Sequence, residues 1–238
     1  MKTPFSILIL LLLTTLVGCS QDYTITGSID GAIDGDSVIL GYSADGENFT
    51  TVDKTTVENG LFHFSGKTKG SKIYYIGYEQ SIEPMYMLFF LEAGDISIQM
   101  AANNGIVTGT SSNDLNNEIE KTTMRYVETM LDADFKLQSD TLMSDSAKAK
   151  LNLTVAEARR DATLYLRNII EDNIESIVSL YLLVQYHDLF NIEELEQLVK
   201  KIPSKNIDRK NNCIYDVLIE AINERKSTNS PQEDSYEW

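Results

Sequence analysis

The chain has 238 residues, of which 36 are acidic and 20 are basic, so its formal net charge at pH 7 is −16. A surface this acidic repels phosphate polymers and anionic headgroups, which disfavours nucleic acid and charge-driven membrane adhesion as modes of binding. The length suits one large domain or two small ones.

The N-terminus predicts an export signal. Lys2 provides a positive end, and the hydrophobic segment over residues 5–17 is too short to span a bilayer. It ends in LVGC, which resembles the bacterial lipobox, in which the cysteine is diacylated and becomes the mature N-terminus. We therefore expect residues 1–18 to be a lipoprotein signal peptide and residues 19–22 to be a lipidated N-terminus attached through Cys19. The alternative is an ordinary signal peptide whose removal leaves this cysteine as a free thiol.

Residues 23–110 predict a β-rich domain. Short β-branched and aromatic runs alternate with turn signals, which is typical of an antiparallel sandwich or barrel of about seven or eight strands. Asp45-Gly46 and Asn59-Gly60 predict hairpin turns, because both pairs tolerate the positive φ of tight connections. The strands are expected at residues 23–29, 37–43, 49–57, 61–67, 73–79, 85–92, 96–100 and 106–110.

The strand expected near residue 90 differs from the others. Residues 85–91, MYMLFFL, are apolar at every position. A strand without alternation is typical of the middle of a sheet that is covered on both faces. We expect a central strand here, with helices from the second region on one side.

Residues 111–226 predict an all-helical region of about five helices, because the hydrophobic period changes to about 3.6 and glycine disappears. The fold class is therefore α+β, and the polar tail over residues 227–238 predicts disorder. The helices are expected from a cap at Ser112 or Asn113 to a polar break at 139–146, and at 148–172, 175–186, 192–201 and 208–225. The residues expected to face inward are Leu115, Ile119, Thr122, Tyr126, Met130 and Leu131 in the first helix, and Leu151, Val155, Ala158, Ala162, Tyr165 and Ile169 in the second.

No pattern in the sequence predicts catalysis. The segment GLFHFSGKT at residues 60–68 has five residues between its glycines, not the four of a phosphate-binding loop, and a strand rather than a helix follows it. No serine lies in a strained nucleophile turn, and His187-Asp188 is better explained as a pair at a helix C-terminus. We expect a protein that is not an enzyme.

Metal and cofactor chemistry is equally unsupported. Apart from the anchor, one cysteine and two histidines are too few for a zinc centre. Asp30, Asp34 and Asp36 lack the spacing of a helix-loop-helix calcium site and are better explained by turns. We expect no metal and no cofactor. Cys213 is expected to be packed within the last helix, and an exposed thiol that pairs with another protein is the alternative.

Aromatic residues in the strands suggest a contact surface. Flat apolar faces suit sugars or partner side chains, and the face that carries Tyr74, Ile76 and Tyr78 is the best candidate. Ordinary sheet packing explains the same residues and is the preferred interpretation.

The order of the segments resembles a known family. After the lipobox come YTITGSIDGAIDGDSVILGYS, VENGLFHFSGKT, PMYMLFFLEAGDISIQM and IVTGTSSNDLNNEI, which together resemble an N-terminal domain of unknown function in lipoproteins of gut-type Gram-negative bacteria. In that family the domain precedes a thioredoxin-like domain of the TlpA or AhpC/TSA kind. Residues 169–203 resemble the helical linker between the two, so the resemblance covers nearly all of residues 23–225.

The resemblance carries some properties and not others. The chain ends at Trp238, where such proteins continue into a domain with W-C-x-x-C, so the redox activity is not expected here. Proteins of this lineage also accept O-glycans at Asp-Ser/Thr-aliphatic triplets. Ser37, Thr141 and Ser146 occupy such triplets, the last two in a predicted loop.

These observations predict a non-catalytic binding module, anchored by lipid in the cell envelope and most simply at the outer membrane. Its partner is expected to be a thioredoxin-like or other envelope protein, with the oligomeric state left open. Two alternatives remain: a remnant or separate subunit of a thiol-disulfide system, and an envelope lipoprotein that binds a nutrient or glycan.

Overall fold

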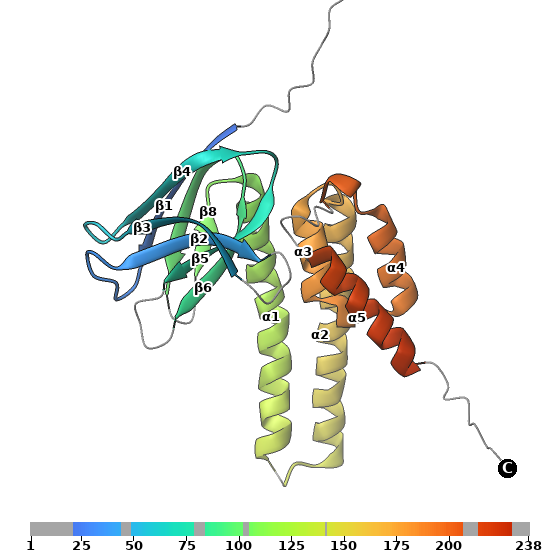
Figure 1. Ribbon diagram of the computed structural model, residues 1–238. Helices are drawn as coiled ribbons and strands as arrows, with labels where there is room; N and C mark the ends of the chain where they lie inside the picture. Colours follow the sequence, from blue (N-terminus) through green and yellow to red (C-terminus); the bar gives the residue numbers. More distant parts are fainter. Residues whose placement is uncertain are drawn as a thin grey trace, which may run out of the picture.

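The computed structural model describes residues 21–43, 49–78, 84–101, 105–140, 142–206 and 214–229. Within these residues, eight strands form two four-stranded sheets, and five α-helices follow them (Figure 1). This confirms the predicted α+β fold. The strands end at Thr108 and the first helix begins at Ser111.

The strand positions agree with the sequence prediction to within two residues at every end. The strands are β1 (Gln21–Ile29), β2 (Ser37–Ser43), β3 (Phe49–Thr56), β4 (Phe62–Thr68), β5 (Lys72–Tyr78), β6 (Met85–Leu91), β7 (Gly94–Met100) and β8 (Ile106–Thr108). The turn at Asn59-Gly60 is confirmed: both residues have positive φ, 54° and 75°, and Glu58 and Leu61 exchange two backbone hydrogen bonds across it. Asp45-Gly46 lies outside the described residues.

The two sheets have the orders β4-β1-β7-β8 and β3-β2-β5-β6. All neighbouring strands are antiparallel except β1 and β7, which pair in parallel from Tyr23↔Gly94 to Ile29↔Met100. This pairing is possible because the intervening strands provide the long crossover that parallel neighbours require. Alternate residues of β1 and β7 point into the sandwich, as in Ile25 and Ile96, which are 1% and 2% exposed.

β6 corrects one prediction, because it lies at the edge of its sheet and not at the centre. Both of its faces are nevertheless covered. Phe89 and Leu91 pack inside the sandwich, whereas Phe90 joins the apolar core of the helical region and meets Tyr181 edge-on at 5.6 Å between ring centres. A run of apolar residues reports that both faces are covered, but it does not report how many strands flank the edges.

The helices after β8 are α1 (Ser111–Ser139), α2 (Asp145–Asp172), α3 (Ile177–Gln185), α4 (Ile192–Lys201) and α5 (Ile214–Asn229). The N-cap of α1 is Thr110, and the predicted cap residues Ser112 and Asn113 lie inside the helix. Their side chains instead bond to β6 and to the residue after it: Asn113 to the backbone of Phe90, and Ser112 to Glu92.

The inner faces of α1 and α2 were predicted only in part. Ile119, Ala158 and Ala162 are buried as expected, but Leu131 is 62% exposed. The far ends of α1 and α2 extend beyond the other helices as a two-helix projection (Figure 1). The buried residues of these helices that were not among those expected to face inward are Ser112, Asn113, Thr123, Ala133, Leu166 and Ile170.

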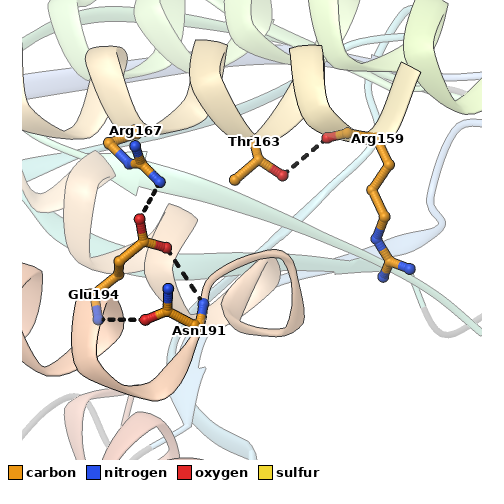
Figure 2. Close-up of polar contacts among 5 residues, drawn as sticks. All are labelled: Arg159, Thr163, Arg167, Asn191 and Glu194. Carbon is orange, nitrogen blue, oxygen red and sulfur yellow. Dashed lines mark hydrogen bonds and ion pairs between the residues drawn. The ribbon is translucent and has the colours of Figure 1, made fainter. Parts of the chain in front are cut away.

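A polar network attaches α4 to α2 (Figure 2). The Asn191 side chain accepts from the Glu194 N–H at 2.8 Å, and the Glu194 carboxylate accepts from the Asn191 N–H at 3.4 Å, which forms a capping box. The same carboxylate accepts a hydrogen bond from the Arg167 guanidinium of α2. Glu194 therefore begins one helix and ties it to another.

Candidate functional site

A groove of about 940 Å³ lies beside the first half of β6, and we call it the β6 groove. It lies where the ends of β1, β5 and β7 meet α1 and α3. Its floor and walls are rich in methionine and tyrosine. The residues that line it are Asp30, Gly31, Tyr78, Pro84, Met85, Tyr86, Met87, Leu88, Met100, Ala101, Gly105, Glu120 and Tyr181.

The outer edge of β6 borders this groove. At the far end of the strand, the Asn113 side chain accepts from the Phe90 N–H at 2.9 Å and donates to the Phe90 carbonyl at 2.8 Å. The amide therefore takes the place of a neighbouring strand. Because backbone groups alternate in direction along a strand, the N–H and C=O of Leu88 face the same outer side. No strand of the described residues pairs with this edge.

The opposite wall of the groove belongs to α1. Asn116 Nδ2 donates to Glu120 Oε1 at 2.8 Å, which fixes the carboxylate at the groove. Asn116 Oδ1 is enclosed and has no hydrogen-bond partner among the described residues. It borders a small cavity of about 30 Å³ that also contacts Met87, Leu88 and Glu120 and so adjoins the groove.

The charge of the groove is negative. Asp30 and Glu120 line it, and no lysine or arginine is among its lining residues. Burial raises the pKa of Tyr181, and the charge of Glu120 raises it further. On the other side, the Tyr78 hydroxyl donates to Asp36 Oδ2 at 2.6 Å. Hydrogen bonds from the Ile33 N–H and then from Tyr78 hold the pKa of Asp36 below its usual value.

A second cleft, of about 620 Å³, lies where the β4–β5 turn meets the start of α1 and the α2–α3 connection. Its polar groups already serve the structure. Glu92 accepts from the N–H and Oγ of Ser112 at 2.7 and 2.8 Å, and Lys205 pairs with Glu175 at 2.6 Å. The charges that line it balance in sign, so it favours no ligand charge. The β6 groove is therefore the better candidate site.

The structure places the predicted contact face inside the sandwich. Ile76 is fully buried and Tyr78 is 6% exposed, whereas Tyr74 is half-buried against the same core. These residues of β5 point toward the opposite sheet, so this face does not form an open surface. Only Tyr78 reaches the β6 groove.

The predicted modification sites fall in different settings. Ser37 is 8% exposed and its Oγ is enclosed, so a glycan cannot be attached there without opening the start of β2. Ser146 is exposed, but it lies in the first turn of α2 and not in a loop. Thr141, Cys19 and Cys213 lie outside the described residues.

The remaining candidate residues do not converge. His63 Nδ1 lies 3.2 Å from Thr26 Oγ1 on β1, and His187 Nδ1 lies 3.3 Å from Asp188. The described part of the chain holds no group of three or more His, Cys, Asp or Glu side chains suited to a metal ion. Among the same residues, no helix is both long and apolar enough to cross a membrane.

Sequence reasoning missed the residues that make the groove. Nothing in the sequence singled out Asn116, Glu120 or Tyr181. Helical periodicity shows which residues share a face of a helix, but not which turn of the helix lies beside a strand edge. The one available signal was the uncharged run MYMLFFL, whose edge position depends on strand order.

Comparison with known proteins gives a family match for the strand-rich part of the chain. No curated protein and no solved structure matches the chain. The family match covers both sheets and the first turns of α1, including Asn113 and Asn116. Residues 23–116 match the family model described as Domain of unknown function (DUF4369).

Proposed function

We propose that this protein is a non-catalytic binding module of the cell envelope that takes an extended polypeptide segment into the β6 groove. The observation that carries the proposal is the position of β6: no strand of the described residues pairs with its outer edge, and its apolar residues Met85, Met87 and Leu88 line the groove. An added strand would bond to the outward N–H and C=O of Leu88, as Asn113 does at Phe90. The groove is also large enough to enclose several side chains of that strand.

The other sheet edges are protected, which singles out β6. β3 exposes threonines together with Asp53 and Lys54 along most of its length. β8 has only three residues, and β4 carries Lys67, which pairs with Asp22 at 3.8 Å. Short strands and charged side chains are the usual means of preventing edge pairing. The first half of β6 has neither.

A peptide experiment tests this mode of binding. The probe is an acetylated and amidated Thr-Val-Thr-Val-Thr-Val-Thr heptapeptide, added to the full chain purified in detergent. We expect slower hydrogen exchange at Leu88, measured by mass spectrometry, because its outward amide becomes bonded. Methylation of alternate backbone nitrogens blocks one edge of the peptide. Of two peptides, one methylated at the odd residues and one at the even residues, one should therefore lose binding and the other should keep it. Equal binding by both peptides, or unchanged exchange, would show that β6 does not pair.

The lipid anchor on Cys19 is the second part of the proposal. It is supported by the LVGC motif after a short hydrophobic segment, and the outer membrane is proposed from the family resemblance. Metabolic labelling with a fatty-acid probe should mark the chain, and Cys19→Ser should abolish the label. A chain that stays unlabelled while it is exported would exclude the anchor.

The thiol-disulfide alternative draws on the resemblance to proteins with a thioredoxin-like domain. Both cysteines lie outside the described residues, so no geometry supports a reaction. A thioredoxin-like reading frame directly downstream would favour a partner of this kind, and that partner could still dock by strand addition. The nutrient alternative predicts a thermal shift with a glycan and none with the heptapeptide.

A further inference from the structure

We propose that the β6 groove selects a segment that carries a lysine or arginine, whose cationic group pairs with Glu120 of α1. The proposal rests on the function proposed above and adds the chemistry of the ligand. It begins from a row of polar residues on α1, at positions 113, 116 and 120, which share one face of the helix at spacings of three and four.

The three residues of this row differ in how many of their hydrogen-bonding groups have partners. Asn113 is 2% exposed and fully used, with bonds to Phe90 and to Thr110 Oγ1. Asn116 uses its Nδ2 to hold Glu120 and keeps an acceptor, Oδ1, without a partner among the described residues. Glu120 is exposed at the groove and forms no ion pair with a described residue. The row therefore ends in a carboxylate that can accept further hydrogen bonds at the groove.

The surroundings of Glu120 suit a long basic side chain. Tyr181 and Leu88 line the groove with Glu120, and three methionines contribute further apolar surface. Lysine and arginine stems pack on such surfaces while the charged end reaches a carboxylate. Aromatic rings add a further attraction for the cation. The effect of Glu120 on the pKa of Tyr181 agrees with a carboxylate whose charge acts across the groove.

The groove also discriminates against the opposite charge. Asp30 lines the end of the groove that β1 and β7 form, so an acidic segment would meet carboxylates on two sides. The net charge of −16 would oppose its approach from solution as well. A basic segment is attracted by the net charge as it approaches and by the carboxylates once it is in the groove. This favours both its association and its retention.

Three peptides test the selection on the full chain in detergent. They share the sequence Thr-Val-Thr-X-Thr-Val-Thr, with X as lysine, norleucine or glutamate, and their affinities are measured by calorimetry. Norleucine keeps the apolar stem of lysine without its charge. We expect the lysine peptide to bind at least about tenfold more tightly than the norleucine peptide, as a charge-assisted hydrogen bond in a partly enclosed site should provide. The glutamate peptide should bind most weakly.

Two variants locate the effect. Glu120→Gln should reduce the lysine preference to less than about threefold, because the neutral amide keeps the shape and removes the charge. Glu118→Gln is the matched control: it removes an exposed charge from the same helix outside the groove and should keep the full preference. Unchanged thermal unfolding of both variants confirms that the fold is intact.

The outcomes separate the two proposals. Equal binding of the lysine and norleucine peptides overturns the selection but leaves strand addition standing. Binding of none of the three contradicts strand addition itself. If butylammonium alone matched the affinity of the lysine peptide, the site would be a small-cation pocket and the polypeptide ligand would be wrong.

Discussion

At the scale of single residues, Asn113 connects the start of α1 to the end of β6. Its side-chain amide satisfies both backbone groups of Phe90 and bonds to Thr110, and it is almost wholly buried. An amide is well suited to this position because it offers one donor and one acceptor in the geometry of a peptide group. The residue thus takes the place of a neighbouring strand at this end of β6.

Replacing Asn113 should therefore destabilise the protein. Asn113→Ala leaves a buried N–H and a buried C=O of Phe90 without partners, and we expect a loss of about 2–4 kcal/mol in the free energy of unfolding. Urea denaturation measures it. Asn152→Ala, at an exposed position of α2, is the control and should change stability by less than about 0.5 kcal/mol. A similar loss in both variants would contradict the role of Asn113.

The Asp36–Tyr78 pair predicts a pH dependence. The pKa of Asp36 is lowered in the folded protein, first by the Ile33 N–H and then by the Tyr78 hydroxyl. A lowered carboxyl pKa stabilises the fold above the unfolded pKa of about 3.9, and this stability is lost as the pH falls through the folded value. Tyr78→Phe should therefore destabilise the protein more at pH 7 than at about pH 2.5. Unfolding experiments at both pH values test this, and an equal loss at the two would refute it.

At the scale of elements, the capping box of α4 does two tasks at once. Glu194 pairs with Asn191 at the start of α4 and with Arg167 of α2 (Figure 2). The side chains of Arg167 and Glu194 are 35% and 32% exposed, so solvent screens their attraction only in part. α4 should thus depend on α2 for its position.

A double-mutant cycle measures this dependence. Arg167→Ala, Glu194→Ala and the double variant should give a coupling energy of about 1 kcal/mol in urea unfolding. Lys67 and Asp22 form the control pair, with side chains 71% and 82% exposed, and their coupling should be close to zero. A negligible value for both pairs would mean that α4 is held by apolar packing alone.

The elements also show how much the sequence could predict. Strand positions and most helix positions followed from local periodicity and turn residues, and Asn59-Gly60 is an example where the backbone φ values agree. The end of the last helix did not: α5 continues to Asn229, beyond the predicted end at 225 and into the segment predicted to be disordered. The edge position of β6 and the exposure of Leu131 did not follow, because both depend on which elements lie alongside. The same limit applies to the groove. Its acidic wall is contributed by α1 and its apolar edge by β6, and no local pattern connects them.

At the scale of the whole molecule, two apolar cores share the strands β5 and β6. Alternate residues of β6 belong to different cores: Phe89 to the sandwich and Phe90, together with Ile73 of β5, to the helices. Phe90 and Ile73 are direct cross-strand partners. Neither core can lose β5 and β6 without affecting the other, so the two should unfold together.

Substitutions in either core test that cooperativity. Phe90→Ala should cost about 3–5 kcal/mol, and Phe62→Ala in the sandwich should cost a similar amount. Both side chains are buried, at 1% and 0% exposure. In native-state hydrogen exchange, each variant should lower the protection of β7 and α3 by the same free energy. Loss confined to β7 in Phe62→Ala would show that the helices fold independently.

The early start of β1 determines how the molecule would stand on a bilayer. Regular strand structure begins at Gln21, only two residues beyond Cys19, so an acylated Cys19 would place the sheet within roughly 7 Å of its lipid-bearing residue. A connection this short would leave the domain little rotational freedom relative to the membrane. Asp30 follows the far end of β1, roughly 27 Å along the strand. The mouth of the groove would then stand clear of the headgroups, and a segment captured there would arrive from the aqueous side of the envelope.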